Sequence, residues 1–167
     1  ASQIRQDFNC FGGFGQQGYG YNITSLLAEI RSILSIDVEH TLVIAGAGNI
    51  GRALTSFAGF GEIGFRVLAL FDVDPSVVGS EVDGKPVYDM AQLEDFIREN
   101  GVDIGVIAAR RSVAQEIADT MVRAGIKGIW NFVPADLAVS VPSENVHLSD
   151  SICALSYRIT HTGEFED

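Results

Sequence analysis

The sequence predicts an α/β fold, in which helices wind both faces of a parallel sheet and a further helix follows at the C-terminus. Three observations lead to this prediction. Short apolar runs typical of buried parallel strands alternate with segments of helical periodicity. A glycine-rich loop joins the first of these runs to the next helical segment, and an aspartate stands at the end of the second run. Such alternation is typical of parallel sheets with right-handed crossovers.

The composition is that of one ordinary folded domain. The 167 residues are 47% hydrophobic, with 18 glycines and 4 prolines. No apolar run reaches the ~18 residues of a membrane span, and no secretory leader opens the chain, so we expect a soluble cytoplasmic protein with no membrane partner. The net charge of −11 argues against nucleic acid as a partner of these residues. Cys10 and Cys153 form no metal-binding spacing, and we expect two reduced structural thiols.

The first helix follows a segment without apolar periodicity. Residues 1–20 hold a glycine and aromatic cluster, which predicts a linker or turn region whose aromatic side chains dock on another surface. From Asn22 to Leu34 apolar residues recur at steps of three and four, as on one face of a helix, and Asn22 or Thr24 is the expected cap.

The strands and helices of the sheet follow in order. Strands are expected at residues 41–45, 65–71, 103–108 and 128–132. Helices are expected after the glycine loop, around residues 93–97, and at residues 112–124. The side chains expected to face inward are Ala53, Leu54, Phe57, Leu93, Phe96, Ile97, Val113, Ile117, Met121 and Val122. The tail helix at residues 151–159 either covers the sheet of its own subunit or reaches into a partner.

The glycine loop matches the G-x-G-x-x-G fingerprint in its full context. It consists of Gly46, Ala47, Gly48, Asn49, Ile50 and Gly51. It follows a strand and opens a helix, and Asp72 lies 21 positions beyond Gly51, close to the ~20 that the fingerprint requires. The sequence therefore predicts a Rossmann-type dinucleotide-binding domain.

Each part of this motif has an expected role. Gly46 permits the tight turn, Gly48 lets the backbone approach a diphosphate, and Gly51 allows close packing of helix and strand. The diphosphate would accept hydrogen bonds from amides at the helix N-terminus. Asp72 would bind the adenine ribose and repel a 2′-phosphate, which favours NADH and NAD over the phosphorylated cofactors. The alternative is that the glycines serve packing alone and Asp72 caps the turn at residues 72–75.

Further walls of the site are expected after the other strands, because ligands of such sheets bind outside the carboxyl ends of the strands. The candidates are Val73, Asp74, Ala108, Ala109, Arg110, Asn131, Phe132 and Pro134. Arg110 and Arg111 either approach the diphosphate or are solvated residues at the start of a helix.

Residues for catalysis are lacking. A dehydrogenase needs a proton donor or acceptor beside the nicotinamide, yet none of His40, His147 and His161 pairs in sequence with an evident catalytic carboxylate. No Ser-His-Asp or metal-ligand spacing occurs. We therefore expect no enzyme, and a bound nucleotide that acts as a signal.

Several stretches resemble the Rex family of redox-sensing transcriptional repressors over nearly the whole chain. They are residues 2–8, 11–15, 18–22, 46–54, 71–75, 86–88, 124–129 and 131–134. The resemblance implies a winged-helix DNA-binding domain, a Rossmann domain that senses the NADH/NAD ratio, and a C-terminal helix exchanged within a homodimer. It implies a division into residues 1–21, 22–144 and 145–167.

On this resemblance Ser2, Gln3 and Arg5 belong to the end of the DNA-reading helix, and residues 11–21 form the wing region and link. Most of the winged helix is absent, so we expect a fragment and operator binding only by the full-length protein. The resemblance also implies an aromatic hydroxyl and an acid in the redox switch. Phe57 and His147 occupy those two positions here, so neither position has the family's usual residue. Leu148 and Tyr157 belong to the exchanged helix. The two differences concern the redox switch more than the nucleotide site.

Three other functions stay open from the sequence. A dehydrogenase fragment would account for the cofactor motif, and an NAD-binding module that regulates potassium transport would account for the size. A CoA-binding domain shares the topology, although Asp72 argues against it.

Overall fold

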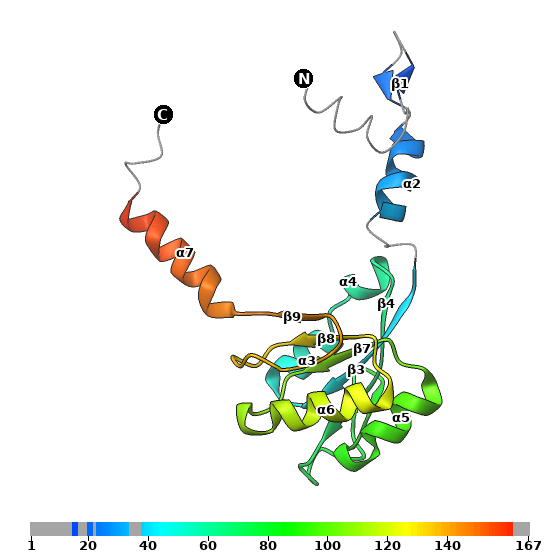
Figure 1. The fold of residues 1–167 in the computed structure, drawn as a ribbon, viewed down its shortest axis with the longest axis vertical. Helices are drawn as coiled ribbons and strands as arrows, with labels where there is room; N and C mark the ends of the chain where they lie inside the picture. The colour runs from blue at the N-terminus through cyan, green and yellow to red at the C-terminus, as the bar shows by residue number, and fades with distance from the viewer. Residues whose placement is uncertain (1–14, 17–19, 22, 34–37, 162–167) are drawn as a thin grey trace.

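The computed structural model describes residues 15–16, 20–21, 23–33 and 38–161. Seven strands form one sheet in the order β5-β6-β4-β3-β7-β8-β9 (Figure 1). Their bounds are β3 His40–Ala45, β4 Phe65–Asp72, β5 Glu81–Val82, β6 Lys85–Asp89, β7 Ile104–Ile107, β8 Gly128–Asn131 and β9 Ser143–Asn145. All neighbours pair in parallel except β5 and β6. The predicted α/β fold with a wound parallel sheet is confirmed.

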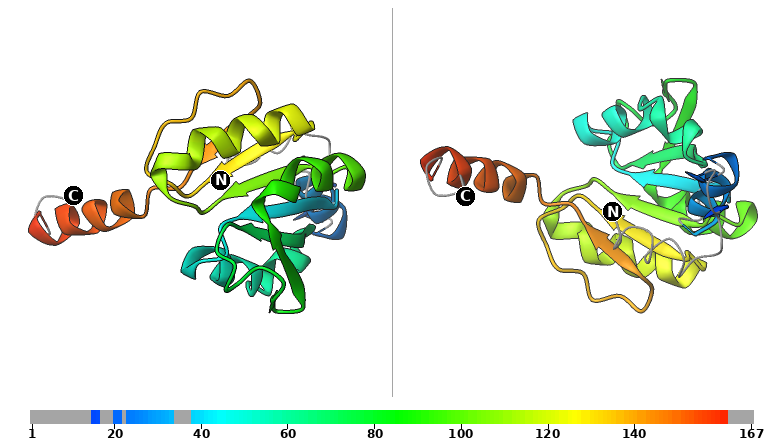
Figure 2. Two further views of the ribbon diagram at one scale, coloured as in Figure 1. Left: turned by 90° about the horizontal axis from the view of Figure 1, so that it is seen from below. Right: turned by 90° about the horizontal axis from the view of Figure 1, so that it is seen from above.

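Helices cover both faces of this sheet. They are α3 Asn49–Thr55, α4 Gly59–Glu62, α5 Leu93–Asn100 and α6 Ala114–Ala124, with 3₁₀ turns η1 Met90–Gln92 and η2 Arg111–Val113. α5 and α6 pack side by side on one face, and α3 lies on the opposite face (Figure 2). The result is the three-layer arrangement expected when helices connect parallel strands.

Two hydrophobic clusters hold the layers together. Along β3 the side chains alternate, so that Val43 joins the cluster under α5 and α6 while Ile44 joins the cluster on the other face. Both are fully buried, as are Phe71 of β4 and Met121 of α6. The continuous apolar runs of the sequence thus correspond to strands buried on both faces.

Three predicted inward positions are wrong. Ala53 is exposed because α3 buries the face that carries Gly51 and Thr55. Phe57 is 56% exposed because α3 ends at Thr55, and Phe57 lies beyond it next to Phe60. Val113 is 37% exposed because it lies in η2, whose three-residue turn breaks the helical spacing. Leu93, Ile97, Ile117 and Met121 are buried as predicted.

Two parts of the sheet, the β5–β6 hairpin and β9, were not predicted from the sequence. β5 and β6 form a hairpin around Asp83 and Gly84, both with positive φ, and this Asp-Gly pair is a known hairpin signal. β9 is short, polar and at the sheet edge, where it pairs with β8. Its sequence has no apolar pattern, so only the tertiary context specifies it.

Segments at both ends lie apart from the sheet. β1 Gly15–Gln16 and β2 Gly20–Tyr21 pair as an antiparallel hairpin where the composition indicated only a linker or turn, and α2 Ile23–Ile33 follows. Asn22, the expected cap, lies outside the described residues. α7 Leu148–Thr160 extends away from the sheet in every view, so within one chain the tail does not cover its own sheet (Figures 1 and 2).

The state of the cysteines and the presence of a membrane-spanning helix can be given for the described part of the chain only. Cys153 is a free, exposed thiol on α7, whereas Cys10 lies outside it. Within the ranges that the structure describes, no helix is both long and apolar enough to cross a membrane.

Candidate functional site

The glycine loop lies where the strand order of the sheet reverses. From β3 the chain adds β4 and β6 on one side, and it then adds β7, β8 and β9 on the other. The connections that leave β3 and β7 therefore diverge, and such a point in a parallel sheet is where ligands bind. Residues 46–51 follow β3 directly, at this reversal.

Gly46 and Gly51 are required by close approaches of the backbone. Gly46 has a φ of 109°, and its amide donates to the carbonyl of Phe71 at 2.7 Å. A Cβ on Gly46 would collide with the carbonyl of Ala108, and one on Gly51 would collide with the carbonyl of Gly46. The loop is thus packed between β4 and the end of β7.

Gly48 differs from Gly46 and Gly51, because no neighbouring backbone approaches it closely. A Cβ there would meet no protein atom within 4 Å, and its φ of −76° and ψ of −165° suit any residue. The protein's own packing therefore does not require glycine at this position, and the space above it is open. α3 has only seven residues and no side-chain cap, so the amides of the loop, more than a helix dipole, are the groups offered to a ligand.

The Asp72 carboxylate has two functions in the structure. Its Oδ2 accepts from the amide of Ala47 at 2.7 Å, and its Oδ1 accepts from Val73 and Asp74 at 2.8 and 3.0 Å. It therefore caps the turn that follows and also holds the glycine loop. A carboxylate offers about four acceptor positions, so one remains on Oδ2 for a sugar hydroxyl.

Arg52 completes the attachment of the loop, and the sequence did not single it out. Its Nε donates to the carbonyl of Ala47 at 2.8 Å. The Ala47 residue is thereby held on both sides, through its amide by Asp72 and through its carbonyl by Arg52. This double attachment fixes the loop without any ligand.

The turn after β4 is exposed. Val73 is 75% exposed, and the Asp74 carboxylate accepts from the amide of Ser76 at 2.9 Å. Hydrogen bonds from Ser76 hold the pKa of Asp74 below its usual range. Asp74 therefore stabilises its own turn, beside the carboxylate of Asp72.

The far wall comes from the ends of β7 and β8. Ala108 donates its amide to Ala45 at 2.8 Å, which draws the Ala108–Ala109 peptide against the loop. Asn131 is fully buried, and its Nδ2 lies within 3.0 Å of Val133 O, Ala135 O and Asn145 Oδ1. Its side chain thus shapes the connection that carries Phe132 and the exposed Pro134.

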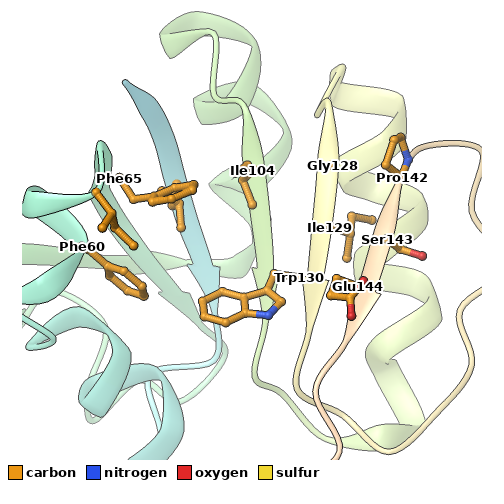
Figure 3. Close-up of a pocket in the computed structure, with 11 residues that line it drawn as sticks. Phe60, Phe65, Ile104, Gly128, Ile129, Trp130, Pro142, Ser143 and Glu144 are labelled. Carbon is orange, nitrogen blue, oxygen red and sulfur yellow. The ribbon is translucent and has the colours of Figure 1, made fainter. Parts of the chain in front are cut away.

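A second feature, an apolar groove, lies on the α3 and α4 face at the amino-terminal halves of the strands. It has a volume of about 490 Å³ (Figure 3). Phe60 and Trp130 pack edge to face in its lining, with ring centres 6.0 Å apart, and Phe65 and Ile104 also line it. The connection that joins β8 to β9, residues 132–142, packs on the opposite face, where Leu137, Val139 and Val141 contact the cluster under α5 and α6. Within the described residues, no helix covers the groove on its own face. Sequence patterns gave no sign of this groove.

Comparisons with known proteins identify the family to which the chain belongs. The family model described as the CoA binding domain matches residues 37–135. The redox-sensing transcriptional repressor Rex of Clostridium tetani is 48% identical over 166 residues, which cover 98% of this chain and 79% of that protein. The chain belongs to the Rex family of redox-sensing transcriptional repressors. Residues 37–135 also belong to the CoA binding domain family, and this range contains the strands from β3 to β8.

Solved Rex structures agree with this membership. RSP, a Rex-family repressor, in complex with beta-NAD+ and operator DNA is 47% identical, with a TM-score of 0.89 over 99% of this chain and 77% of that one. RSP in complex with beta-NADH is 43% identical, with a TM-score of 0.86 over 99% and 78%. The curated relatives are repressors and not enzymes, in line with the expectation from the missing catalytic pair.

The residues expected in the Rex switch lie just after α3, just before α7 and within α7. Phe57 stands against Phe60 with ring centres 5.1 Å apart, at the end of the α3 segment. His147 precedes α7, and its Nδ1 lies 3.5 Å from Asp150 Oδ2. Tyr157 stacks on His161 at 4.2 Å, and Leu148 begins α7. The expected DNA-reading residues Ser2, Gln3 and Arg5 lie outside the described residues.

Proposed function

We propose that this chain binds NADH and NAD+ at the glycine loop, as the redox-sensing module of a Rex repressor. The observation that carries the proposal is the open space above Gly48, in a loop whose neighbour Ala47 is already held by Asp72. Family membership supports it, because RSP has been solved with both nucleotides.

The residues of this chain would bind the nucleotide in two parts. Amides of residues 48–51 would donate to the diphosphate, and the remaining acceptor position of Asp72 would take a hydroxyl of the adenine ribose. The other half of the nucleotide would lie along Ala108, Ala109 and the segment of Phe132. No group in these walls is placed to exchange a proton with the nicotinamide, so binding and release would carry the signal.

The cofactor preference follows from Asp72. A phosphate on the adenine ribose, as in NADPH or CoA, would bring its charge against this carboxylate. Titration calorimetry of NADH, NAD+, NADPH and CoA into the chain tests the proposal. We expect NADH to bind most tightly and NADPH and CoA to bind at least tenfold more weakly. A preference for CoA or NADPH, or no binding of any of the four, would overturn it.

We also infer that the chain forms a homodimer through α7. Ile152 and Leu155, three residues apart on this helix, are 61% and 51% exposed. Burying such side chains stabilises a protein by about 1.5–3 kcal/mol each. The groove beside Phe60 and Trp130 is apolar, is covered by no helix among the described residues, and would receive α7 of a second copy.

Light scattering coupled to gel filtration tests the dimer. The unmodified chain should have the mass of two copies, and Leu155→Asp should shift it to one copy at micromolar concentration. Ala91→Asp is the matched control, because it adds the same charge at an exposed position of η1, away from α7 and from the groove, and it should stay dimeric. A monomeric unmodified chain, or a Leu155→Asp variant as dimeric as the control, would contradict this inference.

The switch would join the two sites. Nucleotide binding would alter the arrangement of the subunits through Phe57, which follows the glycine-loop helix, and through His147, which precedes the exchanged helix. Leu148 and Tyr157 would anchor α7 in the partner. Operator DNA would be bound through the segment of Ser2, Gln3 and Arg5 in the full-length protein. A gel-shift assay with operator DNA should then show binding by the full-length protein and none by residues 22–167.

A further inference from the structure

Two arginines directly follow the strand on the far side of the crevice. Arg110 and Arg111 come after the Ala108–Ala109 peptide that packs against Gly46, and both are exposed. The carbonyl of Arg110 accepts from Val113 at 3.1 Å, which fixes the backbone where η2 begins. The pair is therefore attached to the end of β7 and not to a long loop.

This pair differs from the other described arginines. Arg66 pairs with Glu39, and Arg98 and Arg123 both pair with Glu94. Among the described residues, Arg110 and Arg111 have neither an ion pair nor a side-chain hydrogen bond. The chain carries 22 acids against 11 basic residues, so carboxylates are plentiful. Cations at the start of a helix are also mildly unfavourable, by about 0.3–1 kcal/mol each. The protein's own stability does not explain two unpaired positive charges here.

The position of the pair relative to a dinucleotide follows from the topology. Asp72, at the end of β4, marks the side of the adenine ribose. A dinucleotide that spans the reversal between β3 and β7 has its second half over β7 and β8. Arg110 and Arg111 are at the end of β7, so they are on the side of the nicotinamide and not of the adenine.

We propose that Arg110 and Arg111 bias the site toward the reduced nucleotide by electrostatic repulsion of the oxidised one. The nicotinamide ring is a cation in NAD+ and is neutral in NADH, while the rest of the two molecules is the same. A positive field near the ring therefore raises the Kd of NAD+ and leaves that of NADH nearly unchanged. The inference rests on the proposed NAD(H) site and specifies its redox preference.

The competing role is a direct contact with the diphosphate. Both nucleotides carry the same diphosphate, so that contact would strengthen the binding of NADH, NAD+ and ADP-ribose equally. The loop amides on the β3 side already serve the diphosphate in the proposed site. Because Arg110 and Arg111 lie beyond β7, we favour an effect on the nicotinamide ring over a contact with the diphosphate.

Calorimetry with NADH, NAD+ and ADP-ribose on the double variant Arg110→Gln/Arg111→Gln separates these roles. Glutamine keeps a polar side chain with an N–H donor group and removes the positive charge. Arg66→Gln is the control, because Arg66 lies near the amino-terminal end of β4 and its loss changes the net charge as each single substitution does. Titrations at about 50 and 500 mM salt complete the design, because exposed charges are screened at high salt.

We expect NAD+ to bind the double variant about fivefold more tightly, with NADH and ADP-ribose unchanged within twofold. This gain should shrink at 500 mM salt and be absent in Arg66→Gln. Equal weakening of all three ligands would assign the arginines to the diphosphate and overturn the inference, as would an unchanged ratio of the NAD+ and NADH affinities. Binding of none of the three by the unmodified chain would overturn the proposed site itself.

Discussion

The backbone amide of Ala47 donates to Oδ2 of Asp72 at 2.7 Å, across a sequence separation of 25 residues. This bond joins the glycine loop after β3 to the acid at the end of β4. The same carboxylate caps its own turn through Oδ1, so the loop and the turn are held by one side chain, the one proposed to bind the ribose.

Asp72→Asn should weaken NADH binding about tenfold. One oxygen becomes an NH₂ group, which would face a backbone amide donor either at Ala47 or at Val73 and Asp74. The loss of negative charge should also reduce the discrimination against NADPH. Titration of both nucleotides measures the effect, with Asp74→Asn as the control, since Asp74 binds only its own turn. Equal effects of the two substitutions would count against a ribose-binding role of Asp72.

Gly46→Ala should destabilise the fold itself. Its φ of 109° is unfavourable for alanine, and the new Cβ would collide with the carbonyl of Ala108. We expect a loss of more than about 2 kcal/mol in the free energy of unfolding, measured in urea. Gly61→Ala, where a Cβ meets nothing within 4 Å, should change it by less than about 1 kcal/mol. A Gly46→Ala variant as stable as this control would show that the close approach is not real.

Asn131→Ala should also act on stability. The buried side chain accepts from the amide of Val133 at 2.9 Å, and the two N–H groups of its Nδ2 lie within 3.0 Å of three oxygens. Alanine would remove this partner from the Val133 amide and the Ala135 carbonyl, whereas the Val133 carbonyl keeps its bond from the Ala135 amide. Unsatisfied buried groups cost about 1–3 kcal/mol each, so we expect a loss of roughly 2–4 kcal/mol. Asn100→Ala removes one exposed bond and should cost under about 1 kcal/mol. Urea unfolding distinguishes the two variants, and similar losses would contradict the buried network.

The stability of the sheet should fall at acidic pH through Asp103. Its carboxylate accepts from Lys127 Nζ at 2.6 Å and from the amide of Thr41 at 3.1 Å. The hydrogen bond from Lys127 is the main cause that lowers the pKa of Asp103 from its ordinary value. A lowered folded-state pKa means that this stabilisation is complete above the unfolded pKa, about 3.9, and is lost as the pH falls through the folded one.

Asp103→Asn should therefore flatten the dependence of unfolding free energy on pH below about 4. Asp119→Asn is the control, because that exposed aspartate accepts only from Gln115. Urea unfolding at several values of pH is the measurement. An acid-induced loss in Asp103→Asn as steep as in the control would show that other groups are responsible.

The sequence was sufficient for the four central strands β4, β3, β7 and β8 and for the positions of the glycine loop and Asp72 in the chain. The runs at β3 and β4 are continuous and apolar because both faces are buried, and the motif places Gly46 and Asp72 by chain order alone. Phe57 was misplaced because periodicity does not show where a helix stops, and α3 ends after seven residues. The polar strand β9 depends on pairing with β8, which no local pattern reveals.

Some features of the site depend on contacts between distant residues. The bond of Asp72 to Ala47 and the enclosure of Asn131 involve backbone groups whose positions are known only after folding. The groove at Phe60 and Trp130 joins residues 70 positions apart. No local pattern indicates the groove, because it forms between side chains of separate strands and of α4.

Titration of NADH into the Gly48→Val variant tests the central claim most directly. The added side chain would occupy the open space above the loop and contact no protein atom at its Cβ, so the variant should fold normally and lose NADH binding by at least a hundredfold. Gly61→Val, with equally open surroundings in α4, should bind NADH as the unmodified chain does. Unchanged NADH affinity in a folded Gly48→Val variant would contradict binding at this loop.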